Sequence, residues 1–280
     1  MNCNEINIRD PFILKENGKF YLYGTRAAGF GVNVHGVDVY VSENLIDWNE
    51  KTECLDSVRY GLDRGVNWAP EVHKYKDRFY MFITFTKEND LRGTYILSSD
   101  RPEGPFAPHS KGAVTPFEWE CLDGTFYVED GIPYLVFCRE HTRIIDGTVC
   151  YVRLSDDLTE AVGEPVTLFS ASSPAWADKK PAGEHYVTDG PFMYKSVSGK
   201  LFMIWSTFIK DNYAECIVSF DSGSIKGDFR HLDPITAEDG GHGMLFRDDK
   251  LYFTYHSPNK SGDERVRIVE VTDNGDTIKI

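Results

Sequence analysis

The feature that most constrains this chain is a strand–turn–strand unit that occurs five times along its 280 residues. Each copy holds a short strand, a tight polar turn, an aromatic strand and a third, alternating strand. Turns such as ENGK, YKDR and VEDGI supply the Gly, Asn and Asp residues that hairpins need for positive φ. The copies recur roughly every 50 to 65 residues, slightly above the ~40–50 residues of known propeller blades. They begin at Asp10, Ala69, Leu122, Thr188 and His242.

The repeats predict an all-β fold, a five-bladed β-propeller, in which residues 1–280 form a single domain. With 41% hydrophobic and 26% charged residues, the chain has enough apolar surface to bury a full core. A β-sandwich is the alternative fold, but it does not explain why the same strand pattern returns five times. The fourth strand of each blade is the hardest to find in the sequence.

The acidic composition argues against two classes of partner. A formal net charge of −14 repels nucleic acid and anionic membranes at long range, whereas a neutral oligosaccharide is not repelled. No segment approaches the ~18 apolar residues of a membrane span, and the start MNCNEINIRD lacks the regions of a signal peptide, so we expect a cytoplasmic protein. The six cysteines include no C-x-x-C pair, which makes a zinc site improbable.

Equivalent positions of the five repeats should meet at one mouth, because the first strand of each propeller blade lines the central channel. Residues at comparable places on these strands are Asp10, Glu71, Asp123, Asp189 and His242. The ends of the second strands return to the same face and carry Arg26, Lys87, Arg139, Glu140, His141, Phe208 and His256. A single Asp before Gly or Pro usually only forms a turn, but recurrence at one blade position indicates a functional cluster. Glycosidic cleavage needs one protonated and one ionised carboxyl group, and this mouth supplies both.

At these residues the sequence resembles glycoside hydrolase family 43, whose members are five-bladed propellers. RDPFILKENGKFYLYGT is similar to the family's opening, which implies that Asp10 is the general base. NWAPEVHKYKDRFYMFIT resembles the family's WAP segment and implies that Trp68 and Glu71 contact the sugar. LDGTFYVEDGIPYLVF is similar to the blade with the aspartate that orients the acid and modulates its pKa, here Asp123.

The fourth repeat departs from the family pattern at the general acid. The family has Glu-Gly-Pro or Glu-Ala-Pro there, whereas this chain reads TDGPFMY, which puts the shorter Asp189 in that place. Either Asp189 donates the proton or Glu140, in CREH, does so instead. Family members invert the anomeric centre, which implies carboxyl groups roughly 6.5–9.5 Å apart with a water between base and sugar.

The resemblance leaves His242, in GGHGMLF, with two possible roles: near a structural calcium, or hydrogen-bonded in the channel or to the sugar. Calcium prefers oxygen ligands, which favours the second role, and the reaction itself requires no cofactor. Further candidate sugar contacts are the aromatic residues Phe30 and Phe208, the hydrogen-bonding residues Arg26 and Arg139, and His256.

By family resemblance the substrate is a plant-type oligosaccharide that loses a terminal α-L-arabinofuranosyl or β-xylosyl residue. The inserts at residues 29–39 and 172–186 could close one end of the pocket and so favour exo action. Two alternatives remain. A non-catalytic sugar-binding propeller would explain the aspartate at position 189, and a glycoside phosphorylase would need a cationic cradle for phosphate that no motif provides.

Overall fold

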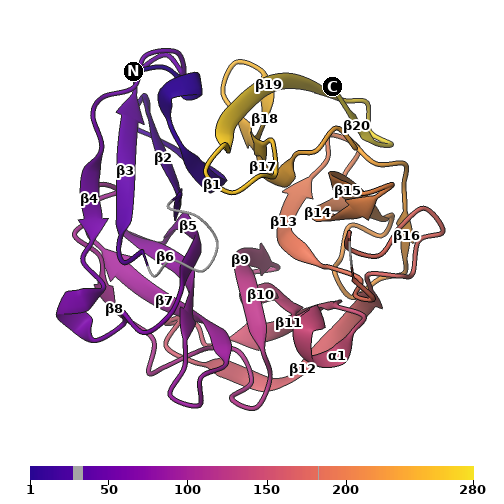
Figure 1. Cartoon of the computed structure of the whole chain (residues 1–280), viewed down its shortest axis with the longest axis horizontal. Helices are drawn as coiled ribbons and strands as arrows, with labels where there is room; N and C mark the ends of the chain where they lie inside the picture. The colour runs from indigo at the N-terminus through magenta and orange to yellow at the C-terminus, as the bar shows by residue number, and fades with distance from the viewer. Residues whose placement is uncertain (28–33, 182) are drawn as a thin grey trace.

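In the computed structural model, the described part of the chain contains twenty strands that form five antiparallel sheets around a central axis (Figure 1). The predicted five-bladed β-propeller is therefore confirmed. The structure describes residues 1–27, 34–181 and 183–280. Phe30 and parts of both inserts lie outside the described residues.

Each blade consists of four strands that are consecutive in the sequence, ordered from the axis outward. Blade 1 contains β1 (Ile8–Glu16), β2 (Lys19–Arg26), β3 (Val37–Ser42) and β4 (Thr52–Leu55). Blade 2 contains β5 (Asn67–Tyr75), β6 (Arg78–Thr86), β7 (Arg92–Ser99) and β8 (Ala107–Pro108). Blade 3 contains β9 (Cys121–Glu129), β10 (Ile132–Arg139), β11 (Thr148–Leu154) and β12 (Ala161–Ser170).

The last two blades follow the same plan. Blade 4 contains β13 (Asp189–Lys195), β14 (Leu201–Ile209), β15 (Asn212–Phe220) and β16 (Phe229–His231). Blade 5 contains β17 (Gly241–Arg247), β18 (Leu251–Ser257), β19 (Arg265–Asp273) and β20 (Ile278–Lys279). Among the described residues, η1 (Cys3–Glu5) precedes β1, whereas η2 (Val58–Tyr60) and α1 (His141–Ile144) are short helical turns that connect strands.

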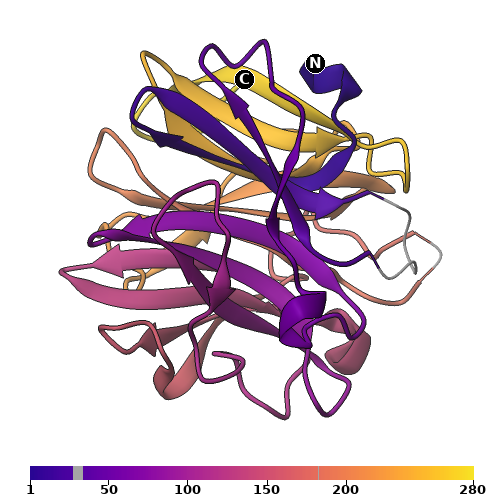
Figure 2. The ribbon, with the colours of Figure 1, turned by 90° about the vertical axis from the view of Figure 1, so that its left-hand side faces the viewer.

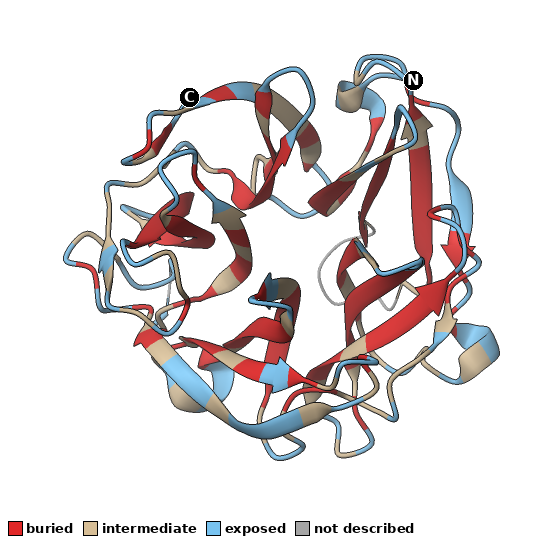
Figure 3. Cartoon of the chain, turned by 180° about the vertical axis from the view of Figure 1, so that it is seen from behind, coloured by how far each residue is buried: buried red, intermediate tan, exposed pale blue. Residues whose placement is uncertain are grey.

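In blade 4 the middle strands β14 and β15 are more buried than the innermost strand β13 and the outermost strand β16 (Figure 3). All but the last residue of β14 are buried, because this strand pairs with β13 and β15 and neighbouring blades cover both its faces. Its run LFMIW has no polar alternation, as expected of a strand that is covered on both faces. The outermost strand β12 is mostly exposed. Apolar clusters fill the spaces between adjacent blades and hold the sheets together.

Aromatic rings from four blades fill the channel along the innermost strands. Phe12 lies 4.9 Å from His73 and 6.2 Å from Phe192, measured between ring centroids. His73 in turn lies 5.7 Å from Phe126. These rings lie further along the strands than the polar residues at the strand starts. The central space at the strand starts is therefore closed on one side by aromatic rings.

A β-bulge interrupts every innermost strand near its start. The register of each inner pair shifts there, and one residue in each bulge has φ between 47° and 56°. These five bulge residues are Asp10, Ala69, Asp123, Gly190 and His242. The predicted equivalence therefore holds for Asp10, Asp123 and His242, but it is wrong by one residue for Asp189 and by two for Glu71. The extra residue of a bulge cannot be read from strand alternation.

The first and last blades lie side by side (Figures 1 and 2). β1 packs against β17 and β18, and η1 packs against β19. Over the described residues, no helix has the length and apolar character needed to span a membrane.

Candidate active site

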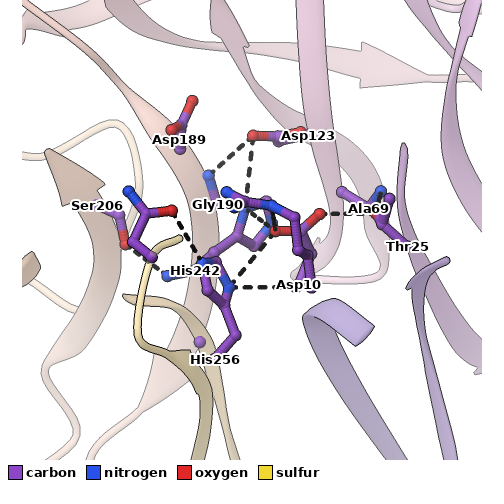
Figure 4. Close-up of polar contacts among 12 residues, drawn as sticks. Asp10, Thr25, Ala69, Asp123, Asp189, Gly190, Ser206, His242 and His256 are labelled. Atoms are coloured by element: carbon purple, nitrogen blue, oxygen red, sulfur yellow. Dashed lines mark hydrogen bonds and ion pairs between the residues drawn. The ribbon is translucent and has the colours of Figure 1, made fainter. Parts of the chain in front are cut away.

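A pocket of about 660 Å³ opens at the bulged ends of the innermost strands. Residues from all five blades line it, including Asp10, Trp68, Asp123, Asp189 and His242. Its volume lies within the range of roughly 300–1,000 Å³ that is usual for small-molecule sites. The bulges place polar groups at this end of the strands, so the site is a direct consequence of the repeated local geometry (Figure 4).

Asp10 is buried and contacts four neighbouring side chains, one of which is His256, whose Nδ1 lies 3.6 Å from Oδ1. The Thr25 hydroxyl donates a hydrogen bond of 2.6 Å to Oδ2, and His242 Nδ1 lies 3.1 Å from Oδ1. Arg9 Nε lies 3.9 Å from the same Oδ1. Burial alone would raise the pKa of Asp10, but the charges of His242 and Arg9 outweigh burial and lower it. Asp10 is therefore ionised at neutral pH.

Asp123 faces His242 from the other side. Its Oδ2 lies 3.8 Å from His242 Nδ1 and accepts a hydrogen bond of 3.2 Å from the Gly190 backbone amide. Burial raises the pKa of Asp123 well above its ordinary value, and the charges of Asp189 and Asp10 add to that rise. Burial would lower the pKa of His242, but the surrounding carboxylates, Asp10 first, raise it. The imidazole thus forms a positive centre between carboxyl groups.

Asp189 lies at the first residue of β13 and lines the pocket. Its Oδ2 accepts a hydrogen bond of 3.0 Å from the Tyr213 hydroxyl. Burial raises the pKa of Asp189, and the negative charge of Glu140 raises it further. Asp189 therefore favours the protonated form, the opposite of Asp10.

Glu140 also lines the pocket, but its surroundings favour its ionised form. Its Oε2 lies 3.0 Å from Arg92 Nη2, and its Oε1 contacts His141 Nδ1. Burial would raise the pKa of Glu140, but the His141 contact and the Arg92 charge outweigh burial and lower it. Arg92 also donates a hydrogen bond of 2.6 Å to Glu120 Oε1, so the guanidinium is fixed between two carboxylates.

The other predicted sugar contacts fall into two groups. Those that line the pocket are Arg26, Trp68 and Phe208, and Arg26 is tied by hydrogen bonds to Asp38 and Glu53. Those outside the pocket lining are Glu71, Arg139 and His256. Each of these three has another neighbour: Glu71 Oε2 lies 2.8 Å from His73 Nε2, the Arg139 guanidinium lies 4.1 Å from the Trp119 ring centroid, and His256 is buried behind Asp10.

Sequence reasoning missed several pocket residues, namely Arg9, Arg92, Tyr213 and Glu264. For two of them the sequence contains a feature that could have indicated the site. Arg9 directly precedes Asp10, and Tyr213 lies on β15 two residues before Glu215, a lone acid in the apolar run YAECIVSF. The approach of Arg92 to Glu140 joins two blades, and no local pattern predicts it.

The donors around His242 do not fit a calcium ion. Its Nδ1 faces Asp10 and Asp123, and the part of the chain that the structure describes contains no group of three or more His, Cys, Asp or Glu side chains placed to hold a metal. Calcium would need six to eight oxygen ligands.

The sequence profile described as glycosyl hydrolases family 43 matches residues 5–274. The chain belongs to this family. As a family 43 enzyme it hydrolyses glycosidic bonds, and its substrate is a carbohydrate.

Three relatives illustrate the similarity of this family 43 chain to known enzymes. The crystal structure of an endo-arabinase from Bacteroides thetaiotaomicron is 35% identical, with a TM-score of 0.89 over 97% of this chain and 96% of that one. A xylosidase/arabinosidase of Bacteroides ovatus is 24% identical over 88% of this chain and 85% of its own length. An α-L-arabinofuranosidase B of Pyricularia oryzae is 26% identical over 77% of this chain, which spans only 44% of that relative.

Proposed function

We propose that this family 43 hydrolase inverts the anomeric centre as it removes a terminal α-L-arabinofuranosyl or β-xylosyl residue from an oligosaccharide. The observation that carries the proposal is that the surroundings of two pocket carboxyl groups shift their pKa values in opposite directions. His242, 3.1 Å away, and Arg9 lower the pKa of Asp10, whereas burial and the charge of Glu140 raise the pKa of Asp189. Paired groups whose surroundings push their pKa values apart are the usual acid and base of a hydrolase.

In this mechanism Asp10 takes a proton from the attacking water and Asp189 gives its proton to the leaving glycosidic oxygen. The Thr25 hydroxyl and His242 fix the orientation of the Asp10 carboxylate, and therefore the direction of its remaining lone pairs. Tyr213 fixes Asp189 in the same way. Asp123 accepts the Gly190 amide directly after Asp189, and the charges of Asp189 and Asp10 contribute to its own raised pKa.

The ionisation of Glu140 supports Asp189 as the acid. A general acid must carry a proton before the reaction, and Arg92 together with His141 stabilises the unprotonated form of Glu140. Glu140 then acts on the reaction through its charge. The names of the relatives support pentose glycosides as substrates, since they include arabinofuranosidase and xylosidase.

The first experiment measures release of p-nitrophenol from the α-L-arabinofuranoside and the β-xyloside. Wild type should cleave at least one, and Asp10→Asn and Asp189→Asn should each lower kcat by at least about 10³-fold, since the reaction requires both groups. Proton NMR of the first product should show the inverted anomer. Wild type that cleaves neither glycoside, or that retains the configuration, would contradict the proposal. Turnover that depends on phosphate would indicate a phosphorylase instead.

A second candidate is endo action on arabinan, favoured by the 35% identity to a structure described as an endo-arabinase. Exo action should release monosaccharide from linear arabino-oligosaccharides from the first time point. Endo action should release mixed oligosaccharides and lower the viscosity of arabinan early. The product profile therefore separates the two modes without any variant.

A further inference from the structure

The five bulges are joined by a ring of hydrogen bonds that runs from blade to blade. On each second strand, one buried residue lies opposite the residue that precedes the bulge; these are Thr25, Thr84, Cys138, Ser206 and His256. In three blades its hydroxyl accepts the bulge amide of the next blade. These bonds run from the amides of Ala69 to Thr25 (2.7 Å), Asp123 to Thr84 (2.9 Å) and His242 to Ser206 (2.7 Å).

The two remaining positions do not carry a hydroxyl. Cys138 has a thiol, which is a weak acceptor, and the next bulge amide, that of Gly190, is bonded instead to Asp123 Oδ2. His256 lies at the junction between the last and first blades. Its Nδ1 accepts the Asp10 amide at 3.3 Å, so an imidazole completes the ring there (Figure 4).

The contacts of His256 define its tautomer. Two Asp10 atoms face Nδ1: the backbone N at 3.3 Å, within hydrogen-bond distance, and Oδ1 at 3.6 Å, beyond it. The backbone N–H can only donate, so with this hydrogen bond Nδ1 carries a lone pair and the ring proton sits on Nε2. Nε2 lies 3.3 Å from Asn259 Oδ1, which is placed to accept that proton. Burial lowers the pKa of His256 to about 3, and the Arg9 charge adds to the effect. The side chain is therefore a neutral acceptor throughout the range in which the enzyme would act.

His256 also touches the support of the second carboxyl group. Its ring stacks on the Tyr213 ring, with centroids 5.7 Å apart and planes 23° apart. The Tyr213 hydroxyl donates a hydrogen bond to Asp189 Oδ2. One fully buried imidazole thus supports the backbone of Asp10 and packs against the tyrosine that holds Asp189.

We propose that His256 is a positioning residue for the reaction: it closes the ring of bulge hydrogen bonds and, through Nδ1, holds Asp10 at the place from which its carboxylate acts. The inference rests on the proposed role of Asp10 as base. It assigns His256 a role through the Asp10 backbone, because the imidazole is buried and does not line the pocket.

The test compares two nearly isosteric replacements. His256→Asn keeps an acceptor close to the position of Nδ1, whereas His256→Leu removes it, and both lose the ring that stacks on Tyr213. Leu should lower kcat by about 10- to 100-fold with KM changed less than about threefold, because a misplaced base slows the chemical step more than binding. Asn should stay within about fivefold of wild type in kcat.

A second readout does not depend on turnover. Hydrogen–deuterium exchange at the Asp10 amide should be at least about tenfold faster in His256→Leu than in wild type or His256→Asn, because that amide has lost its acceptor. If His256→Leu does not fold, His256→Gln replaces it, since its amide group reaches the position of Nε2 and leaves Nδ1 unmatched.

The outcomes separate this inference from the proposed function. Unchanged Asp10 exchange in His256→Leu, or equal loss of kcat in the Asn and Leu variants, overturns the inference even if wild type is active. If wild type cleaves no glycoside, the proposed function is wrong. Hydrogen–deuterium exchange at the Asp10 amide still decides whether His256 closes the ring of hydrogen bonds. If His256 had only a structural role, its replacement by Leu would lower Tm without lowering kcat more than it changes KM.

Discussion

The negative charge of Glu140 raises the pKa of Asp189, so removing that charge tests which of the two groups donates the proton. A negative charge nearby favours protonated Asp189, so removing it in Glu140→Gln should lower the pKa of Asp189. Activity requires the protonated acid and is lost as pH rises through that pKa. The alkaline limb of the kcat/KM profile should therefore move to lower pH in Glu140→Gln, while activity at acidic pH persists.

Glu120→Gln is the matched control for that profile. Glu120 is bonded to the same Arg92 guanidinium on its other side, but its charge is not among the causes of the Asp189 shift. The alkaline limb of the kcat/KM profile of Glu120→Gln should stay at the wild-type position. Loss of activity in Glu140→Gln at every pH, with activity retained in Asp189→Asn, would instead identify Glu140 as the acid.

Glu215 is a buried carboxyl group that the mechanism does not use. Its Oε2 accepts bonds from the Gly243 amide (2.9 Å) and the Ser206 hydroxyl (3.1 Å), and burial raises its pKa to about 8. The unfolded chain loses this proton near its ordinary pKa of 4.5, so the free energy of unfolding falls as pH rises from about 4.5 to about 8. Glu215→Gln removes that dependence.

We therefore expect Glu215→Gln to gain up to about 4 kcal/mol of stability over wild type at pH 7.5 but only about 1 kcal/mol at pH 5, since each pKa unit is worth ~1.4 kcal/mol. Urea unfolding at the two pH values measures the difference. A gain of the same size at both pH values would show that Glu215 does not take up its proton on folding.

At the scale of the strand, the bulge of β13 differs from the other four because its residue is Gly190. Positive φ alone does not explain the glycine, since the other bulges carry Asp, Ala and His at similar angles. A Cβ on Gly190 would lie 2.6 Å from His242 Cδ2 and 3.1 Å from the His242 Cα. Glycine is thus needed for the close approach of β13 to the imidazole between Asp10 and Asp123.

Gly190→Ala should displace His242, lower kcat/KM by more than about 100-fold and lower the free energy of unfolding by about 2–3 kcal/mol, as overpacking does. Ala69→Gly, at the equivalent bulge of β5, is the control and should change stability by less than about 1 kcal/mol. Kinetics and thermal unfolding of both proteins check this. Wild-type kinetics in Gly190→Ala would show that the position of His242 is not critical.

The strand scale also explains how far the sequence could predict this site. Alternation and turn residues predicted the five repeats, because both patterns are local. Asp10, Asp123 and His242 were predicted to meet, and they do, since each occupies the bulge itself. Glu71 was misplaced because the bulge of β5 puts Ala69 there. Four of the five bulge amides are bonded to Thr25 or its equivalents on the preceding blade, and no local pattern reveals bonds between blades.

On the scale of the whole molecule, each sheet is complete within consecutive strands, so the blades are joined by side chains and by backbone bonds outside the sheets, such as Phe106 N to Cys54 O at 2.8 Å. Besides His256, the junction between the first and last blades contains an ion pair, Arg9 Nη1 to Glu264 Oε1 at 2.8 Å. Glu264 is fully buried and also accepts the Gly262 amide at 2.7 Å. Distant ends of the chain meet here, so these partners could not be paired from the sequence.

Removing this buried carboxylate should weaken the closure of the propeller. Glu264→Ala should lower the free energy of unfolding by about 3 kcal/mol and Tm by about 6–10 °C, because Arg9 would lose a desolvated partner. Asp263→Ala breaks the exposed pair with Lys260 in the same loop and should cost less than about 0.5 kcal/mol. If residues 1–280 form one cooperative domain, calorimetry should show a single transition in both variants. Two transitions in Glu264→Ala would mean that the blades unfold separately once the junction opens, and no loss of Tm would mean that the other contacts between β1 and blade 5 suffice for closure.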